Sequence, residues 1–271
     1  MKKTLFFALA LALSLPMLKA QYYGNGGLRA GRINVFAGIH SGIPNETNFW
    51  GAYYTTDSWG YTHWDFREIA PSTLSYGMSP SLGVDLSILN DRSETFLIGA
   101  TAGLFGTKNK INATFDKTLL GRPYDTEVDI ETNLIDFHIG IAGMVYVVPE
   151  KVSIDFSVSP GFLISFGDQV RYKRTPAVIG DTDDNTWGKP EKNDSMFPNL
   201  DVFALGRIGA SYHFTDIMWV GALFQYRQPL FAFGGEMFAD DTKCKINGDL
   251  KYSDRKHKGW ALLLTWGIDL D

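Results

Sequence analysis

The sequence predicts an all-β chain, folded as an eight-stranded antiparallel transmembrane up-and-down β-barrel with four long extracellular loops. Two observations carry this prediction. After residue 20, eight stretches alternate between apolar and small or polar side chains, and the connections between them are long and short in turn. Tight turns at one end and long loops at the other are typical of barrels in an outer membrane. The stretches are 31–40, 79–90, 94–106, 132–148, 152–166, 201–214, 217–228 and 258–270.

The first 20 residues are predicted to be a cleaved signal peptide. Lys2 and Lys3 precede an uncharged apolar core, and a suitable cleavage site follows before Gln21. The core is too short to span a bilayer. We therefore expect 21–30 to be a short periplasmic N-terminal segment and 31–271 to be the outer-membrane barrel.

Composition excludes several classes of protein. The formal charge is −5, and it becomes about −8 once the three lysines of the signal peptide are removed, which argues against a nucleic-acid partner. The single cysteine, Cys244, excludes an internal disulfide framework. A mature length of about 250 residues suits one domain.

Each stretch is expected to point one set of side chains toward lipid, because a strand presents alternate residues to opposite faces. The stretch 152–166 shows this most clearly, with small and polar residues at the intervening positions. In chain order, the expected lipid-facing residues are Ile33, Val35, Ile39; Leu82, Val84, Leu86, Ile88; Phe96, Ile98, Leu104; Ile135, Phe137, Ile139, Ile141, Val145, Val147; Val152, Ile154, Phe156, Val158, Phe162, Ile164, Phe166; Ile208, Ala210, Tyr212, Phe214; Met218, Val220, Phe224, Tyr226; and Trp260, Leu262, Leu264, Trp266, Ile268, Leu270.

The connections fall into two length classes. The short turns are 90–93, 148–151 and 214–217, whereas the long connections have roughly 25 to 40 residues, beyond an ordinary hairpin loop. Pro160 lies within a predicted strand and removes a ladder donor. We therefore predict a bulge at Pro160-Gly161.

The opposite, inward-facing set is polar and decides between a barrel and a β-sandwich. Burying these residues in a sandwich core would carry a large desolvation cost, whereas a barrel lumen lets charges pair with one another or with water. The inward polar residues are Arg32, Asn34, Asp85, Asp136, His138, Asp155, Arg207, Gln225, Arg227 and Asp269.

On this architecture, and on the final strand 265–271, the chain resembles the small eight-stranded outer-membrane proteins of the OmpA-barrel and OmpX type. The resemblance implies a location in the outer membrane of a Gram-negative bacterium, with outer-membrane lipids, lipopolysaccharide and the barrel-assembly machinery as partners. It covers nearly all of the mature chain. Unlike full-length OmpA, the chain is expected to lack a periplasmic peptidoglycan-binding domain.

The inward residues are interpreted as a structural network. The interior of an eight-stranded barrel is just wide enough for side chains to fill, so a general porin is excluded. We expect ion pairs between Arg32 and Asp269 and between Arg227 and Asp136, with a proton or ion path as the alternative. His138 shares a face with Asp136, and such a pair can act as a general base. Without an identifiable nucleophile beside it, we expect no enzyme, catalytic residue, cofactor or metal.

The first long loop is the candidate binding segment. Between residues 49 and 66 it carries many aromatic side chains, which supply large, rigid contact area for a protein or glycan partner. Packing of these rings as a cap over the barrel, or contact with the membrane interface, are the alternatives. The candidate binding residues are Trp50, Tyr54, Trp59, Tyr61 and Trp64.

Other loop features are weaker. Asp125, Glu127, Asp129 and Glu131 form a carboxylate row that could meet divalent ions held by surface lipopolysaccharide or be a solvated face. The stretch 181–192 starts like a calcium loop but lacks the required glycine and glutamate. Cys244 lies between two lysines, which lowers a thiol pKa, and could cross-link to a partner or be incidental.

The expected function is that of a non-catalytic surface or envelope component that binds through its loops. Two alternatives stay open. The protein could be the membrane subunit of an envelope assembly such as a secretion apparatus, or a narrow channel for small solutes. Co-purification of a partner in a fixed ratio would identify an assembly subunit. Single-channel conductance would identify a channel.

Overall fold

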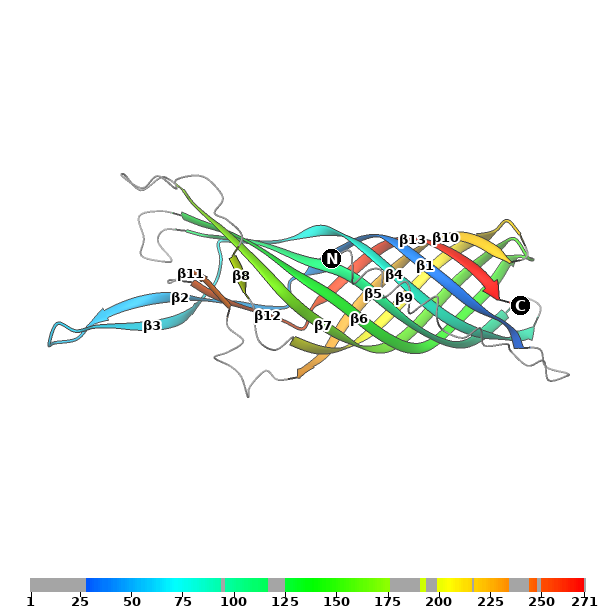
Figure 1. Ribbon diagram of the computed structural model, residues 1–271, viewed down its shortest axis with the longest axis horizontal. Helices are drawn as coiled ribbons and strands as arrows, with labels where there is room; N and C mark the ends of the chain where they lie inside the picture. The colour runs from blue at the N-terminus through cyan, green and yellow to red at the C-terminus, as the bar shows by residue number, and fades with distance from the viewer. Residues whose placement is uncertain are drawn as a thin grey trace.

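The structure is a computed structural model that describes residues 28–93, 96–116, 125–175, 191–193, 199–215, 217–233, 244–247 and 250–270. It is elongated, with a strand barrel at one end and a smaller sheet projecting from the other (Figure 1). Across these residues, no helix has the length and apolar character needed to cross a membrane.

Eight strands form a closed ring, so the predicted fold class is confirmed. The ring runs in the order β6-β5-β4-β1-β13-β10-β9-β7, and pairing of β6 with β7 closes it. Every pairing is antiparallel. The strands are β1 (Leu28–Ile43), β4 (Thr73–Ser93), β5 (Phe96–Phe115), β6 (Asp125–Val148), β7 (Val152–Thr175), β9 (Asn199–His213), β10 (Met218–Phe233) and β13 (Lys258–Leu270).

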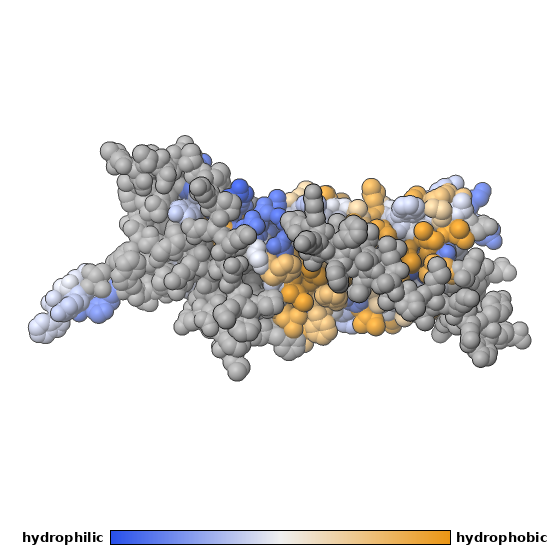
Figure 2. Space-filling view, in the orientation of Figure 1, coloured by the Kyte–Doolittle hydropathy of each residue, from blue (hydrophilic) through white to orange (hydrophobic). Residues whose placement is uncertain are grey.

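The barrel wall has the predicted two faces. Leu264, Ile139 and Val158 are 72%, 66% and 65% exposed, and lie among many other exposed apolar side chains on the ring. Figure 2 shows hydrophobic residues gathered over the barrel on the face in view, which we call the apolar belt. A contiguous exposed apolar surface of this kind suits lipid rather than water. The intervening side chains are buried in the lumen.

Part of the predicted loops is a second sheet. Its strands pair in the order β11-β12-β2-β3, so the first and last long loops combine into one four-stranded unit outside the ring. A short strand from the third long loop, β8 (Glu191–Asn193), pairs with β7. The strands of the second sheet are β2 (Glu46–Thr56), β3 (Thr62–Ile69), β11 (Cys244–Asn247) and β12 (Leu250–Arg255).

Four barrel strands, β4 to β7, continue beyond the apolar belt and carry the second sheet. In β5, β6 and β7, one face of the extension packs against side chains from β2 and β3. Phe49 contacts Phe115 edge-on with ring centroids 5.0 Å apart. The buried cluster is Phe49, Ile69, Ile111, Ala113, Phe115, Val128, Ile130 and Val170.

A bulge lets β7 join this extension. Glu131 pairs with Gln169 but Asn133 pairs with Phe166, so β7 has one extra residue at this point. Gly167 takes a φ of +66°, a left-handed conformation that glycine adopts without strain. The side-chain alternation of β7 is thereby reversed, so that Val170 is buried and Arg171 faces outward.

The predicted bulge at Pro160 is wrong. Pro160 pairs with Ala204 of β9 in an unbroken register. Toward β6, His138 pairs with Gly161 and Ile141 with Val158 in the same register, leaving only the two positions between them unpaired. The missing N–H therefore costs local pairing on one side, and the flanking pairs hold the strands in line. Shifts of register instead occur around two other prolines, between Pro229 and Phe231 and between Gly77 and Leu82.

Truncation of Phe49 to alanine tests whether this cluster holds the second sheet on the barrel. Phe49 is fully buried and not part of the ring, so the cavity should destabilise the second sheet by about 3–5 kcal/mol. Limited proteolysis should then cut the 46–69 hairpin faster, while the barrel core stays protected. Equal cleavage of the variant and the native protein would contradict this role; Ser58→Ala at the exposed hairpin tip is the matched control.

Candidate functional site

The structure brings the predicted inward residues together in the lumen as linked clusters. At the short-turn end, Arg32 Nε lies 2.6 Å from Asp269 Oδ1 on the neighbouring strand. Arg32 Nη1 lies 3.9 Å from Asp155 Oδ1, and its guanidinium stacks 4.6 Å above the Trp219 ring. Ser211 also donates to Asp155. This first cluster joins five different strands across the lumen.

The second cluster centres on His138. Its Nε2 is 3.1 Å from Asp85 Oδ1 and its Nδ1 is 3.2 Å from Asp136 Oδ1. Both ring nitrogens of His138 therefore have a carboxylate partner. Asp85 also pairs with Arg207, which donates to Gln225 at 2.7 Å. His138 therefore bridges Asp136 of β6 and Asp85 of β4.

Arg227 completes the chain of pairs toward the long-loop end. Its Nη1 is 3.3 Å from Asp136 Oδ2, and its Nε donates to the His257 carbonyl at 3.0 Å. His257 in turn contacts Asp201 through both its backbone N–H and Nδ1, at 3.0 and 2.9 Å. Arg227, only 2% exposed, links β10 to β6 and to the segment that leads into β13.

Three lumen residues near Arg227 were not identified from the sequence, namely His40, Asp201 and His257. His40 and Asp201 lie within predicted strands at inward positions, so the alternation could have found them. His257 lies just before β13, after Lys256, whose φ is +53°. His257 lies outside the strands, so the alternation of strand residues could not predict its inward position.

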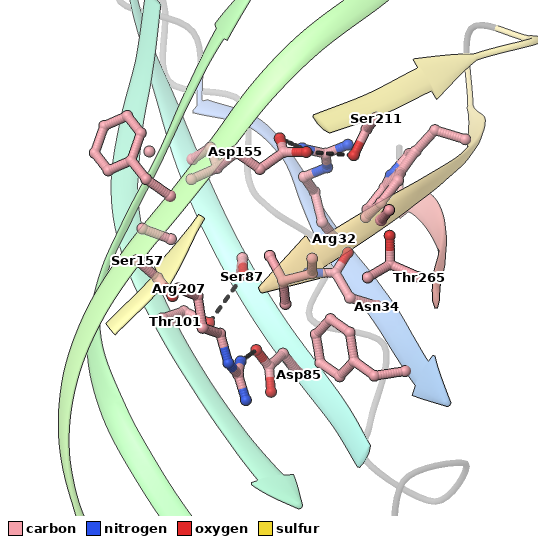
Figure 3. Close-up of a pocket in the computed structure, with 18 residues that line it drawn as sticks. Arg32, Asn34, Asp85, Ser87, Thr101, Asp155, Ser157, Arg207, Ser211 and Thr265 are labelled. Carbon is pink, nitrogen blue, oxygen red and sulfur yellow. Dashed lines mark hydrogen bonds and ion pairs between the residues drawn. The ribbon is translucent and has the colours of Figure 1, made fainter. Parts of the chain in front are cut away.

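A cavity of about 60 Å³ separates the first cluster, around Arg32, from the second cluster, which contains Asp85 and Arg207. Figure 3 shows Arg32, Asp155 and Ser211 at one end and Arg207 with Asp85 at the other. A polar cavity of this size accommodates a few water molecules, which would satisfy polar atoms that lack a protein partner. Among the described residues these atoms include Arg32 Nη2, Arg207 Nη2, Trp219 Nε1 and Asn34 Oδ1.

One serine and one histidine meet in the lumen without the geometry of a hydrolase. Ser153 Oγ is 3.1 Å from His213 Nε2. Asp155, however, accepts from Ser153 at 3.2 Å and does not orient the histidine as a catalytic carboxylate would. Ser153 is also fully buried, so a substrate could not reach it.

The candidate binding residues separate into different environments. Trp59 and Tyr61 are 84% and 70% exposed at the tip of the β2–β3 hairpin. Trp50 lies in β2, half-buried, between Lys251 of β12 and Glu68 of β3. The backbones of Tyr54 and Trp64 pair across the hairpin, but their side chains lie outside what the structure describes.

The hairpin tip is built around Asp57. Its Oδ1 accepts the backbone N–H groups of Trp59 and Tyr61, each at 2.9 Å, and its Oδ2 lies 3.0 Å from His63 Nε2. Gly60, with φ +81°, allows the tight turn between the two aromatic residues. The hydrogen bond from His63, aided by the backbone N–H groups, lowers the pKa of the Asp57 carboxyl. Asp57 thus stays ionised and holds both rings outward.

The predicted carboxylate row lies on the outward face of β6 and is paired with cations. Arg171 Nη2 is 2.6 Å from Asp129 Oδ2, and Lys173 Nζ is 4.0 Å from Glu127 Oε1. Glu131 is contacted from β5 by two lysines. Cys244 begins β11, but its side chain and most of the failed calcium stretch 181–192 lie outside the described residues.

Arg227 and Asp136 offer a test of the lumen network. Removing one partner leaves the other buried and uncompensated, so Arg227→Gln or Asp136→Asn should each lower the free energy of unfolding by about 3–5 kcal/mol. A double variant, Arg227→Met with Asp136→Leu, should recover most of that loss. Urea unfolding in lipid bilayers, followed by tryptophan fluorescence, measures all three. Unchanged stability in the single variants would exclude a structural role for this pair.

No family model matches the chain. No curated protein matches it either. Several solved structures are similar in fold. Ail, the attachment invasion locus protein of Yersinia pestis, solved with the heparin analogue sucrose octasulfate, is 11% identical with a TM-score of 0.30, over 88% of this chain and 99% of that one. OprG from Pseudomonas aeruginosa is 9% identical with a TM-score of 0.35, over 90% and 99%.

The outer membrane protease OmpT from Escherichia coli is 7% identical with a TM-score of 0.41, over 92% of this chain and 99% of that one. Such low identities and TM-scores indicate nothing about function. The closed ring of eight antiparallel strands and its exposed apolar belt are features of this chain itself. By these features the chain has the fold of the small outer-membrane β-barrels.

Proposed function

We propose that the protein is a closed, non-catalytic outer-membrane barrel that presents the β2–β3 hairpin tip to a protein or glycan partner at the cell surface. The observation that carries the proposal is the exposure of Trp59 and Tyr61 on a turn that Asp57 holds in shape. Aromatic side chains are enriched at protein interfaces, where a few of them carry most of the binding energy.

The position of the hairpin supports this role. In Figure 1, β2 and β3 project away from the barrel, beyond the ends of the other strands. The base of the hairpin is anchored through Phe49 and Ile69 in the buried cluster above the membrane. A rigid base and an ordered tip reduce the entropy lost when a partner binds.

The lumen supports a closed barrel over the alternative of a solute channel. Ion pairs cross it at three levels, from Arg32 to Asp155, from Arg207 to Asp85 and from Arg227 to Asp136. Apolar side chains pack in the lumen beside these pairs, with Phe36, Phe105, Leu223, Ala261 and Leu263 in one group and Leu134, Leu163, Phe203 and Leu205 in another. A solute would have to displace paired charges that are costly to separate.

Planar-bilayer recordings test the closed lumen. We expect the purified full-length protein to give no discrete conductance steps, because paired charges and packed side chains occupy the bore. As a control for insertion, the same samples should show protease-protected barrel strands. Reproducible single-channel steps whose size changes in Arg207→Gln would contradict the proposal and favour the channel alternative.

Substitution of both tip aromatics tests the binding role. Trp59→Ala with Tyr61→Ala removes the exposed contact area, so binding of the native partner should fall by at least about 100-fold, since such anchors are worth 2 kcal/mol or more each. The melting temperature should stay unchanged, because neither side chain is buried. The measurement is in-cell photo-cross-linking from position 58, with position 151 on the short-turn end as control.

The native protein should give one cross-linked product that the double variant loses. Products that persist in the double variant, or that form equally from position 151, would exclude the tip as the binding site. A partner that remains attached in fixed ratio after detergent extraction, in both proteins, would instead favour an envelope-assembly subunit.

A further inference from the structure

A charged patch lies directly beyond the lipid-facing belt on β5, β6 and β7. Along these strands, Leu104, Phe137 and Phe162 are register partners in the belt. Four residues further out along β5, the row of register partners contains Lys108 and Phe166. The row after it contains Lys110, Glu131 and Gln169. Figure 2 shows hydrophilic residues adjoining the apolar belt at its loop-facing end. The strands thus change from apolar to charged within a few residues on one continuous face.

The patch lies at the depth of lipid headgroups. Lys108 is four residues beyond Leu104 on β5, or about 13 Å along a strand, and strand tilt shortens this to about 10 Å along the membrane normal. Phe166, in the same row as Lys108, is apolar and exposed, so the apolar surface reaches the level of Lys108. Lys108 and its neighbours therefore border the lipid chains that cover Phe137 and Phe162.

The charges at the membrane-proximal end do not balance. Glu131 is shared by two lysines, with Lys108 Nζ at 2.9 Å and Lys110 Nζ at 3.4 Å. Further out, Arg171 and Lys173 each have a carboxylate of their own. The hydrogen bond from Lys108 lowers the pKa of Glu131, so this carboxyl is ionised at neutral pH. Two positive charges then face one negative charge.

The two ammonium groups lie on the same face of β5, close to the same carboxylate. Their side chains are about one-third exposed, 31% for Lys108 and 36% for Lys110, so both can contact a further anion without leaving Glu131. The buried face of the same strand segment carries Asn109 and Ile111. The lysines are therefore fixed on the outside of the sheet, where lipid is the neighbour.

We propose that Lys108 and Lys110 bind the phosphate group of an anionic lipid in the outer leaflet, whose acyl chains lie along Leu104, Phe137 and Phe162. A phosphate provides the second negative charge that the pair of lysines lacks. The apolar row below the lysines accommodates the chains of the same molecule. A soluble phosphate would match the lysines but not this row, so the geometry favours a lipid. This site is separate from the hairpin tip.

The test uses the full-length protein in nanodiscs of phosphatidylcholine that contain either lipid A or chemically dephosphorylated lipid A, in EDTA. Native mass spectrometry after mild detergent release measures the lipid retained. We expect retention of lipid A and not of the dephosphorylated form. Lys108→Gln with Lys110→Gln should weaken retention by about 30-fold, because each cation near an anionic surface contributes about a fivefold factor.

Glu131→Gln is the matched control, since it breaks the same two ion pairs. We expect it to retain lipid A as well as the native protein or better, because it frees both lysines. Lys151→Gln, at the opposite end of the barrel, should change nothing. Equal retention of the dephosphorylated lipid, an unaffected double lysine variant, or a loss in Glu131→Gln equal to that of the lysine variant would each overturn the proposal. Inorganic pyrophosphate that competes as well as lipid A would also overturn it.

Discussion

The structure depends on one constraint: every backbone hydrogen bond within the hydrocarbon must be made inside the protein, because lipid offers no partner. Eight strands meet this constraint only by closing, with β1 pairing with β13 and β6 with β7. Closure gives each strand a lipid face and a lumen face, and a narrow lumen forces its polar side chains into contact. The pairs of Arg32, Arg207 and Arg227 with aspartates follow from that confinement.

The ring was predictable because its signal is repeated on every strand. Along each strand, apolar residues alternate with small or polar ones. The lumen residues from Arg32 to Asp269 lie at the inward positions of this alternation. It was harder to predict from the sequence which of these residues contact one another. Arg32 and Asp269 lie on strands that must be neighbours once the ring closes, but the link of His138 to Asp85 depends on strand tilt and rotamers.

The loops were predictable in length but not in structure. The pattern identified the aromatic residues of the first loop, yet not that Phe49 is buried against Phe115 while Trp59 is exposed. Phe49 owes its burial to residues of β5, β6 and β7, which are distant from it in the sequence. Proline was a poor guide as well: Pro160 stays in register, whereas a shift of register accompanies Pro229.

The bulge at Gly167 determines which residues after it on β7 face inward and which face outward. Before this point even-numbered residues face lipid, and after it odd-numbered residues face outward. Deleting one residue here would turn Val170 to the outside and Arg171 toward the apolar cluster beside Ile130. Gain or loss of a single residue therefore inverts both faces of the sheet beyond this position. The boundary between membrane and surface sheet is thus a place where chain length, and not only residue type, is under constraint.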